Sequence, residues 1–319
     1  MTQVAGTVDT YGVKGQREDL QDAIFMISKA DTPFLSNIGR NKATAVKHEW
    51  QTDALAAPDT NNAQVEGDDY TYAQSSPTAR VGNVTQISRK PILISGTAEA
   101  VDKAGRKSEL KYRAMKAGKE IKKDMEAITL SPQGSVVGNS TTPRKLGGFA
   151  AWLTSNVSRG AGGANGGFNS GSGVVVAPTA GTNRAWTEGM VKDVQQSAFT
   201  NGGNPSMLML PVALKRQFSA FPGIAQQRRD TGDKAATIVA TADVYQGDFG
   251  KLSAVPNRQF VANRALLIDP QYAKLSVLRP MQTDKPSKTG DAEKRMLITE
   301  YTLEVGNEAA HGTIEDLIV

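Results

Sequence analysis

The sequence contains no cysteine among its 319 residues, and it contains only two histidines, His48 and His311. The absence of cysteine excludes disulfides, thiolate nucleophiles and every metal site that uses a thiolate ligand. His48 lies in a predicted strand beside Glu49, and His311 lies close to the C-terminus. Neither histidine is placed next to a candidate nucleophile, so we interpret both as packing or hydrogen-bonding residues.

Long apolar runs are also absent. No run approaches the ~18 residues of a membrane span, and residues 1–19 lack the apolar stretch of a secretory signal. We therefore expect no membrane contact, and synthesis and folding in a cytoplasm. The net charge of +5 is modest and its sign alternates along the chain, which indicates tolerance of nucleic acid and not a dedicated reader of DNA.

Motifs for phosphate and metal binding are missing too. Residues 160–173 include seven glycines, but they match neither GxGxxG nor a P-loop and carry no lysine, so we interpret them as a flexible surface loop. Carboxylates cluster at 66–69 and 230–233, but a calcium loop begun at Asp59 has Gln64 where glycine is required. We predict no catalytic, cofactor-binding or metal-binding residues, no cofactor, and no enzyme activity.

The longest regular pattern is a helix over residues 108–130, with Ser108 as the N-cap and Ser131-Pro132 as the stop. Its other faces are highly charged, and the bases between 103 and 123 could at most make weak phosphate contacts, because Tyr112 is the only aromatic residue among them and base stacking is not implied. The spacing of the apolar residues predicts one stripe that packs on a sheet. The stripe comprises Leu110, Ala114, Ala117, Ile121, Met125 and Ile128.

Projections precede this helix. Residues 1–20 are polar and predict an arm, followed by a short helix from Glu18 that ends before Pro33. Strand patterns at 46–55 and 80–97 flank a long polar stretch, which predicts an extended hairpin without a core of its own.

A second lobe follows the glycine-rich segment. A helix is predicted over 187–199, a buried strand over 207–210, and a helix opened by Pro211. Two further strands flank residues 247–250 as a hairpin, and a buried strand covers 266–268. A polar linker at 283–291 then leads to a return strand.

The return strand is predicted over 297–305, with Leu297, Tyr301 and Val305 inward and Glu300 and Glu304 outward. A short tail should follow it. The chain thus predicts a body with projections, and projections that cannot stabilise themselves should pack on other copies of the chain.

Six segments carry a specific resemblance, in order through nearly the whole chain: 31–40, 47–55, 80–110, 266–280, 289–305 and 307–314. They resemble the major capsid proteins of tailed bacteriophages, in the branch built on the Hong Kong 97-type capsid fold. The resemblance implies an α+β fold and a structural protein that self-assembles into the icosahedral head enclosing a double-stranded DNA genome.

The resemblance also implies five parts of the chain and several partners. The parts are an N-arm (1–44), an extended E-loop (45–100), a peripheral P-domain with the spine helix (101–180), an axial A-domain (181–282), and a P-domain return strand with a C-terminal tail (283–319). The implied partners are other copies in hexamers and pentamers, a portal, packaged DNA held non-specifically, and decoration proteins. The short arm implies a separate scaffolding protein. The implied location is the virion capsid, assembled in the bacterial host cytoplasm.

Two other classes of protein are alternatives to a phage capsid. The shell of a cellular compartment on the same fold, of the encapsulin kind, would enclose a protein cargo in place of DNA. An enzyme that binds a nucleotide at the glycine-rich segment would show that binding by calorimetry.

Overall fold

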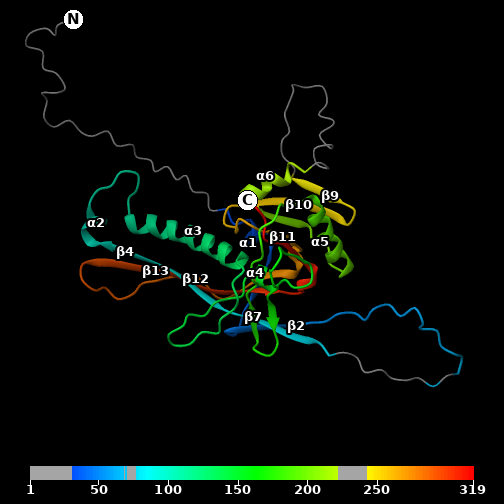
Figure 1. Cartoon of the computed structure of the whole chain (residues 1–319). Coiled ribbons are helices and arrows are strands. Elements are labelled where there is room, and N and C mark those ends of the chain that lie inside the picture. The colour runs from blue at the N-terminus through cyan, green and yellow to red at the C-terminus, as the bar shows by residue number, and fades with distance from the viewer. Residues whose placement is uncertain (1–30, 68, 70–76, 222–242) are drawn as a thin grey trace, which may run out of the picture.

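The computed structural model describes residues 31–67, 69, 77–221 and 243–319 (Figure 1). The predicted arm, the predicted helix from Glu18 and the carboxylates at 230–233 lie outside these ranges. The elements are α1 (Pro33–Asn37), β1 (Gly39–Lys42), β2 (Lys47–Thr52), β3 (Ala79–Val84), β4 (Gln86–Ser95), α2 (Gly96–Ala100), α3 (Glu109–Leu130), α4 (Phe149–Trp152), β5 (Val157–Ser158), β6 (Gly167–Asn169), β7 (Val174–Val176), α5 (Glu188–Thr200), β8 (Met207–Pro211), α6 (Val212–Phe218), β9 (Val244–Gly247), β10 (Gly250–Asn257), β11 (Ala265–Ile268), η1 (Pro270–Tyr272), β12 (Ala273–Asp284), β13 (Ala292–Val305), η2 (Glu308–Ala310) and β14 (Gly312–Ile314).

The long helix α3 lies over a four-stranded sheet with strand order β1-β12-β13-β4 (Figure 1). The predicted cap is confirmed, since the Ser108 hydroxyl accepts a hydrogen bond from the Lys111 amide at 3.2 Å. The predicted stripe is confirmed where it reaches the sheet. Ile121 is completely buried, and Ala117 packs in a cluster with Ile92 of β4 and Leu297 of β13.

A six-stranded sheet, β5-β14-β11-β8-β10-β9, forms the second half of the molecule. Its central strands are buried on both faces, which explains the uninterrupted apolar runs at 207–210 and 265–268. In β8, Met207 and Met209 face the core shared with α1, α4 and the first sheet, whereas Leu208 and Leu210 face α5 and α6. The predicted strands and helices of this lobe are confirmed in the described residues.

The C-terminal segment is not a tail. β14 pairs in parallel with β5 and antiparallel with β11, so it lies inside the six-stranded sheet. His311, at the entry to β14, is fully buried, and its Nδ1 accepts a hydrogen bond from the Asp269 amide at 3.0 Å. Burial lowers the pKa of His311 to about 3, so the ring is neutral.

The predicted hairpin is confirmed at its base, where β2 and β3 pair antiparallel from Lys47↔Val84 to Thr52↔Ala79. The second predicted strand is in fact two strands. The chain changes sheets at Thr85, after which β4 pairs with β13 and forms an edge of the four-stranded sheet. Residues 53–67 of the connection contain no regular element and extend away from the body (Figure 1).

The return strand β13 is confirmed, but its outward face was predicted wrongly. Glu300 is 3% exposed and Glu304 is 7% exposed, because the β2–β3 hairpin and the Arg144 side chain lie across that face. Strand β12, its long partner, was not predicted as a strand. Pro280 and two register shifts interrupt its alternating pattern.

The glycine-rich segment is packed, so its interpretation as a flexible loop was wrong. β6 and β7 pair within and beside it, and the Phe168 ring stacks on Trp152 with centroids 5.8 Å apart. A Cβ at Gly166 would stand 2.2 Å from the Val176 carbonyl oxygen and 2.9 Å from that of Ala151. Glycine is therefore required there because two backbone segments approach closely.

Gly166→Ala should destabilise the subunit by about 1–3 kcal/mol, because its Cβ must displace backbone atoms. Gly189→Ala is the control, since Gly189 lies in the first turn of α5 with no atom nearer than 3.8 Å to its Cβ position. That change should be neutral or slightly stabilising. Urea unfolding of the unassembled subunits measures both. Equal unfolding midpoints for Gly166→Ala and the unmodified chain would restore the interpretation as a loose loop.

The neutral state of His311 predicts a specific loss of stability in acid. The folded pKa of about 3 lies below the ~6.5 of an unfolded histidine, so the unfolded chain binds the extra proton first as pH falls. The contribution of His311 is complete above pH ~6.5 and falls by about 3 kcal/mol by pH ~4.5. His311→Asn keeps an acceptor but does not titrate. Unfolding free energies between these pH values should fall less steeply in His311→Asn, and identical slopes would contradict the assignment.

Candidate functional site: a projecting hairpin and the buried carboxylates that hold it

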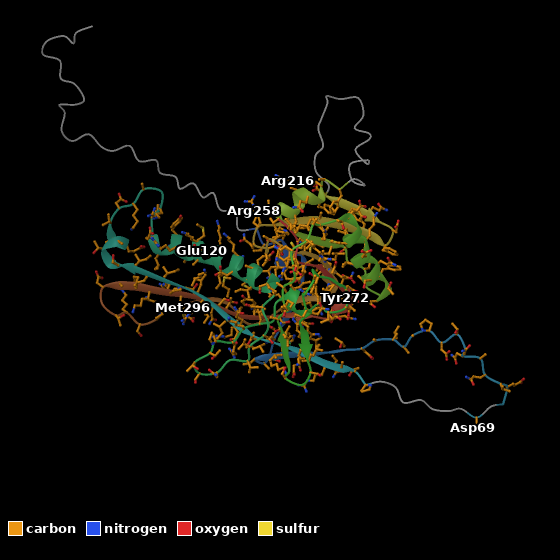
Figure 2. All side chains as sticks on the ribbon, in the orientation of Figure 1. Asp69, Glu120, Arg216, Arg258, Tyr272 and Met296 are labelled. Atoms are coloured by element: carbon orange, nitrogen blue, oxygen red, sulfur yellow. The ribbon has the colours of Figure 1, made fainter. Side chains whose placement is uncertain are left out.

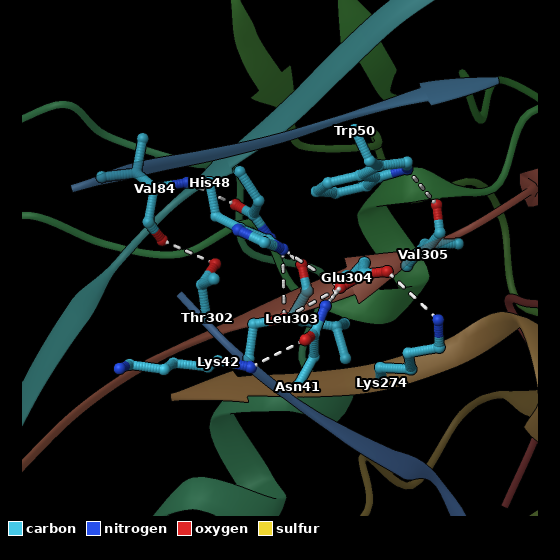
Figure 3. Close-up of polar contacts among 12 residues, drawn as sticks. Asn41, Lys42, His48, Trp50, Val84, Lys274, Thr302, Leu303, Glu304 and Val305 are labelled. Carbon is cyan, nitrogen blue, oxygen red and sulfur yellow. Dashed lines mark hydrogen bonds and ion pairs between the residues drawn. The ribbon is translucent and has the colours of Figure 1, made fainter. Parts of the chain in front are cut away.

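The Glu304 carboxylate on β13 joins three neighbouring strands (Figure 3). Oε2 accepts hydrogen bonds from Asn41 Nδ2 of β1 at 2.9 Å and from Ser276 Oγ of β12 at 2.9 Å. His48 Nε2 of β2 lies 3.0 Å from the same oxygen, and Lys274 Nζ lies 3.6 Å from Oε1. One side chain therefore fixes β1 and β2, the first strand of the hairpin, against β13.

The electrostatics of this group follow from its surroundings. Burial alone would raise the pKa of the Glu304 carboxyl, but the hydrogen bonds from Asn41, His48 and Ser276 outweigh it and lower the pKa. Glu304 is therefore an anion at neutral pH. A buried anion is stable only while its hydrogen-bond donors stay in place. The side chains of Asn41, His48 and Ser276 are therefore fixed together with the carboxylate.

Glu300 lies four residues before Glu304 in β13 and makes a second polar junction on the same face of the strand. Its Oε1 accepts from the Thr85 hydroxyl at 2.9 Å and from Arg144 at 2.6 Å, and its Oε2 accepts from Arg279 Nε at 2.8 Å. Thr85 is the residue at which the chain passes from the hairpin to β4. Arg144 belongs to the long connection between α3 and α4. Glu300 therefore fixes this connection, as well as the chain at Thr85, to β13.

Glu126 on α3 makes the third junction. Its two oxygens accept the amide hydrogens of Phe34 at 2.7 Å and Leu35 at 2.9 Å, at the N-terminus of α1. Asn257 of β10 donates to Oε1 at 2.7 Å. Burial raises the pKa of Glu126, and these hydrogen bonds oppose that rise. Helix α3, helix α1 and the six-stranded sheet thus meet at one carboxylate.

Aromatic and amide side chains complete the base of the hairpin. Trp50 Nε1 donates to the Val305 carbonyl at 3.0 Å, and the Trp50 ring lies 5.3 Å from that of Trp152. Asn83 of β3 is fully buried and donates to the carbonyls of Gly147 and Leu303. These bonds hold both strands of the hairpin against the end of β13.

The hairpin loses all packing beyond Thr52. Every residue of the stretch 53–67 is exposed, including Leu55 at 100% and Val65 at 77%. Asp69, labelled in Figure 2, lies far from the body at the distal end of this segment. The segment thus combines a rigid base with a distal part that has no apolar contact within the described chain.

The described residues include both histidines, and each is held by hydrogen bonds or packing. The described part of the chain contains no group of three or more acidic or histidine side chains suited to a metal ion. His48 is bonded to Glu304 and Ser276, and His311 is enclosed by the sheet, with its ring edge-on to Phe149 at 4.9 Å. None of the helices in the described ranges combines the length and the apolar character needed to cross a membrane.

The sequence pattern predicts the projecting hairpin but not the buried carboxylates of Glu300 and Glu304 that hold it. Glu300 and Glu304 occupy alternate positions of a strand, which normally places a carboxylate in solvent. Only the density of donors in the preceding segments, such as Asn41, His48 and Asn83, hinted that polar partners would be brought to this face.

Comparisons with known proteins agree with this architecture. The model of the SU10 major capsid protein family matches residues 6–318. The major capsid protein of Escherichia phage Phieco32 is 29% identical over 342 residues, covering 96% of this chain and 95% of that protein.

Solved structures of phage proteins share the fold. A capsid asymmetric unit of cyanophage A-1(L) matches with a TM-score of 0.63 at 12% identity, over 97% of this chain and 98% of that one. A protein of Mycobacterium phage Cain matches with a TM-score of 0.61 at 12% identity, over 98% and 99%. A structure of phage G major capsid and decoration proteins matches with a TM-score of 0.54 at 10% identity, over 99% of both chains. The fold is of the Hong Kong 97 type, and the chain belongs to the SU10 major capsid protein family, as a structural capsid protein of a tailed-phage virion.

Proposed function

We propose that residues 53–78 form the extended loop through which each subunit contacts its neighbours in hexamers and pentamers of an icosahedral shell around double-stranded DNA. The observation that carries this proposal is the contrast between the two ends of the hairpin. The base is fixed by Glu304, Trp50 and Asn83, whereas all of residues 53–67 are exposed. A long segment pays conformational entropy to become ordered, so contacts outside its own subunit are needed to order it.

The other parts take the roles that the resemblance implies. Residues 1–44 act as the arm, 101–180 with the return strand as the peripheral domain around α3, and 181–282 as the axial domain. The placement of β14 in the six-stranded sheet supports adding the C-terminal strand to the axial domain. The subunit acts without catalysis or a cofactor, since assembly uses only contact surfaces.

The partners follow from this role. A separate scaffolding protein directs assembly in the host cytoplasm, a portal occupies one vertex, and DNA contacts the inner face through its phosphates. The phage G structure contains decoration proteins, and we extend that possibility to this shell. A cellular compartment shell is the alternative, and purified particles that hold protein cargo and no DNA would support it.

Deleting residues 58–77 should leave the subunit folded, because residues 58–67 have no buried side chain. Each copy would lose contacts with its neighbours, and ~1.4 kcal/mol per contact is tenfold in each association constant. The variant should remain as monomers or capsomers where the full chain closes into particles. Sedimentation velocity and electron microscopy of both proteins measure this.

Trp50→Phe provides a contrast at the base of the hairpin. It removes the hydrogen bond to the Val305 carbonyl and should lower subunit stability by about 1–3 kcal/mol, since that carbonyl loses its donor.

Normal closed shells from the 58–77 deletion would refute the assignment of the loop. Failure of the intact chain to form any particle with its scaffold would refute the role in a shell.

A further inference from the structure

Three charged side chains, Arg159, Glu315 and Arg264, form a row across the six-stranded sheet. Strand β14 lies between β5 and β11. Arg159 directly follows β5, Glu315 directly follows β14, and Arg264 directly precedes β11, which runs antiparallel to β14. The pairing of the strands therefore places the Glu315 carboxylate between the two guanidinium groups.

Both arginines use the same carboxylate oxygen. Arg159 Nη1 donates a hydrogen bond to Glu315 Oε2, and Arg264 Nη2 lies 3.7 Å from that oxygen. The other oxygen, Oε1, lies 3.3 Å from the Thr313 hydroxyl. One carboxylate thus serves two guanidinium groups, each of which carries five N–H donors.

The row is enclosed by the protein. The side chains of Arg159, Arg264 and Glu315 are only 6%, 7% and 2% exposed. Burial of charge away from water is costly unless an opposite charge and hydrogen bonds replace the water. The surroundings of these two arginines should therefore supply both.

Hydrogen-bond donors of both arginines lack that replacement. Three buried nitrogens have no acceptor within the described chain: Arg159 Nη2, Arg264 Nε and Arg264 Nη1. Buried donors in folded proteins are normally paired with protein, water or a bound ligand. These three nitrogens thus mark the place of an acceptor that the described chain does not provide.

Positive charge is also in excess around the row. Asp316 and Arg184 are the charged neighbours that contact it: Asp316 Oδ2 accepts from the Gly160 amide at 3.0 Å, and Arg184 Nη2 donates to the Ser158 hydroxyl at 2.7 Å. With these two residues, three guanidinium groups face two carboxylates. The excess is one positive charge.

The electrostatics of Arg264 agree with this excess. Burial lowers the pKa of the Arg264 guanidinium, and although Glu315 and Asp316 oppose the change, the positive charge of Arg159 adds to it. Arginine nevertheless stays protonated in proteins. An added negative charge near the row would therefore stabilise the fold.

We propose that Arg159 and Arg264 bind one small inorganic monoanion, of the size and charge of chloride, which joins the end of β14 to its neighbours β5 and β11. A monoanion matches the single excess charge and accepts hydrogen bonds from several donors at once. Water would accept the same hydrogen bonds but would leave the charge unmatched. This site is remote in sequence from the projecting hairpin and does not depend on the proposed role in a shell.

Urea unfolding of the unassembled full-length subunit tests the proposal, because urea brings no ions. Sodium chloride is exchanged for sodium gluconate, a much larger anion, at a constant ionic strength of ~0.5 M, so that general screening stays the same. An anion that binds only the folded state lowers the unfolding equilibrium constant in proportion to its concentration above Kd. We expect about a tenfold fall for each tenfold rise in chloride. An unfolding constant that does not change with chloride would overturn the proposal.

Two arginine variants locate the effect. Arg264→Met removes the excess charge and three donors, so the chloride dependence should vanish whatever the stability of the variant. Arg258→Met is the matched control, since Arg258 is exposed and the net charge changes equally. It should keep the full dependence. A full dependence in Arg264→Met, or its loss in Arg258→Met, would place the anion elsewhere and contradict the proposal.

Arg264→Lys covers the case in which Arg264→Met does not fold. It keeps the positive charge with fewer donors, so it should need at least about tenfold more chloride for the same effect. Crystals of the unmodified subunit grown in bromide give a direct check, because the anomalous signal of bromine should lie between Arg159 and Arg264. Bromide found only at other positions would overturn the site. All these measurements use unassembled subunits, so failure of the loop assignment would leave their outcome unchanged.

Discussion

Buried carboxylates must be matched by donors, and Glu126, Glu300 and Glu304 impose this requirement at three of the places in the described chain where distant segments meet. The donors come from α1, β1, the hairpin, β12, the connection after α3 and the six-stranded sheet. Apolar packing stabilises each sheet with its helices, but these polar junctions determine how the projecting segments leave the body. Removing one carboxylate would leave several buried donors without an acceptor. The loss in free energy of unfolding would then exceed that of a single hydrogen bond.

This contrast between a firmly held body and exposed projecting segments suits a shell subunit. The body must be stable before assembly, whereas the surfaces that join copies must stay available. Residues 47–52 and 79–84 are therefore held against the end of β13, and every residue of 53–67 is exposed.

The sequence predicted those elements whose burial follows a simple period. Helix α3 has a clear apolar stripe and a capping serine, helix α5 has a clear apolar stripe, and β8 and β11 are uninterrupted apolar runs. It failed where tertiary contacts override the period: Glu300 and Glu304 alternate like solvent-facing residues, but the hairpin covers them. The glycines of 160–173 looked flexible, because sequence alone does not distinguish a mobile loop from close backbone packing around Gly166. The site is a set of long-range polar contacts, with Glu304 256 positions from His48, so no local motif records it.

Hydrogen exchange on the unassembled Glu304→Ala subunit tests most directly whether a buried carboxylate holds the projections. The account predicts that amides of β1 and β2 exchange at least about tenfold faster than in the unmodified chain, because local opening of these strands becomes easier. Amides of α3 and β8 should keep their protection, since their packing does not involve Glu304. Unchanged protection of β1 and β2, or an equal loss across α3 and β8, would contradict the account.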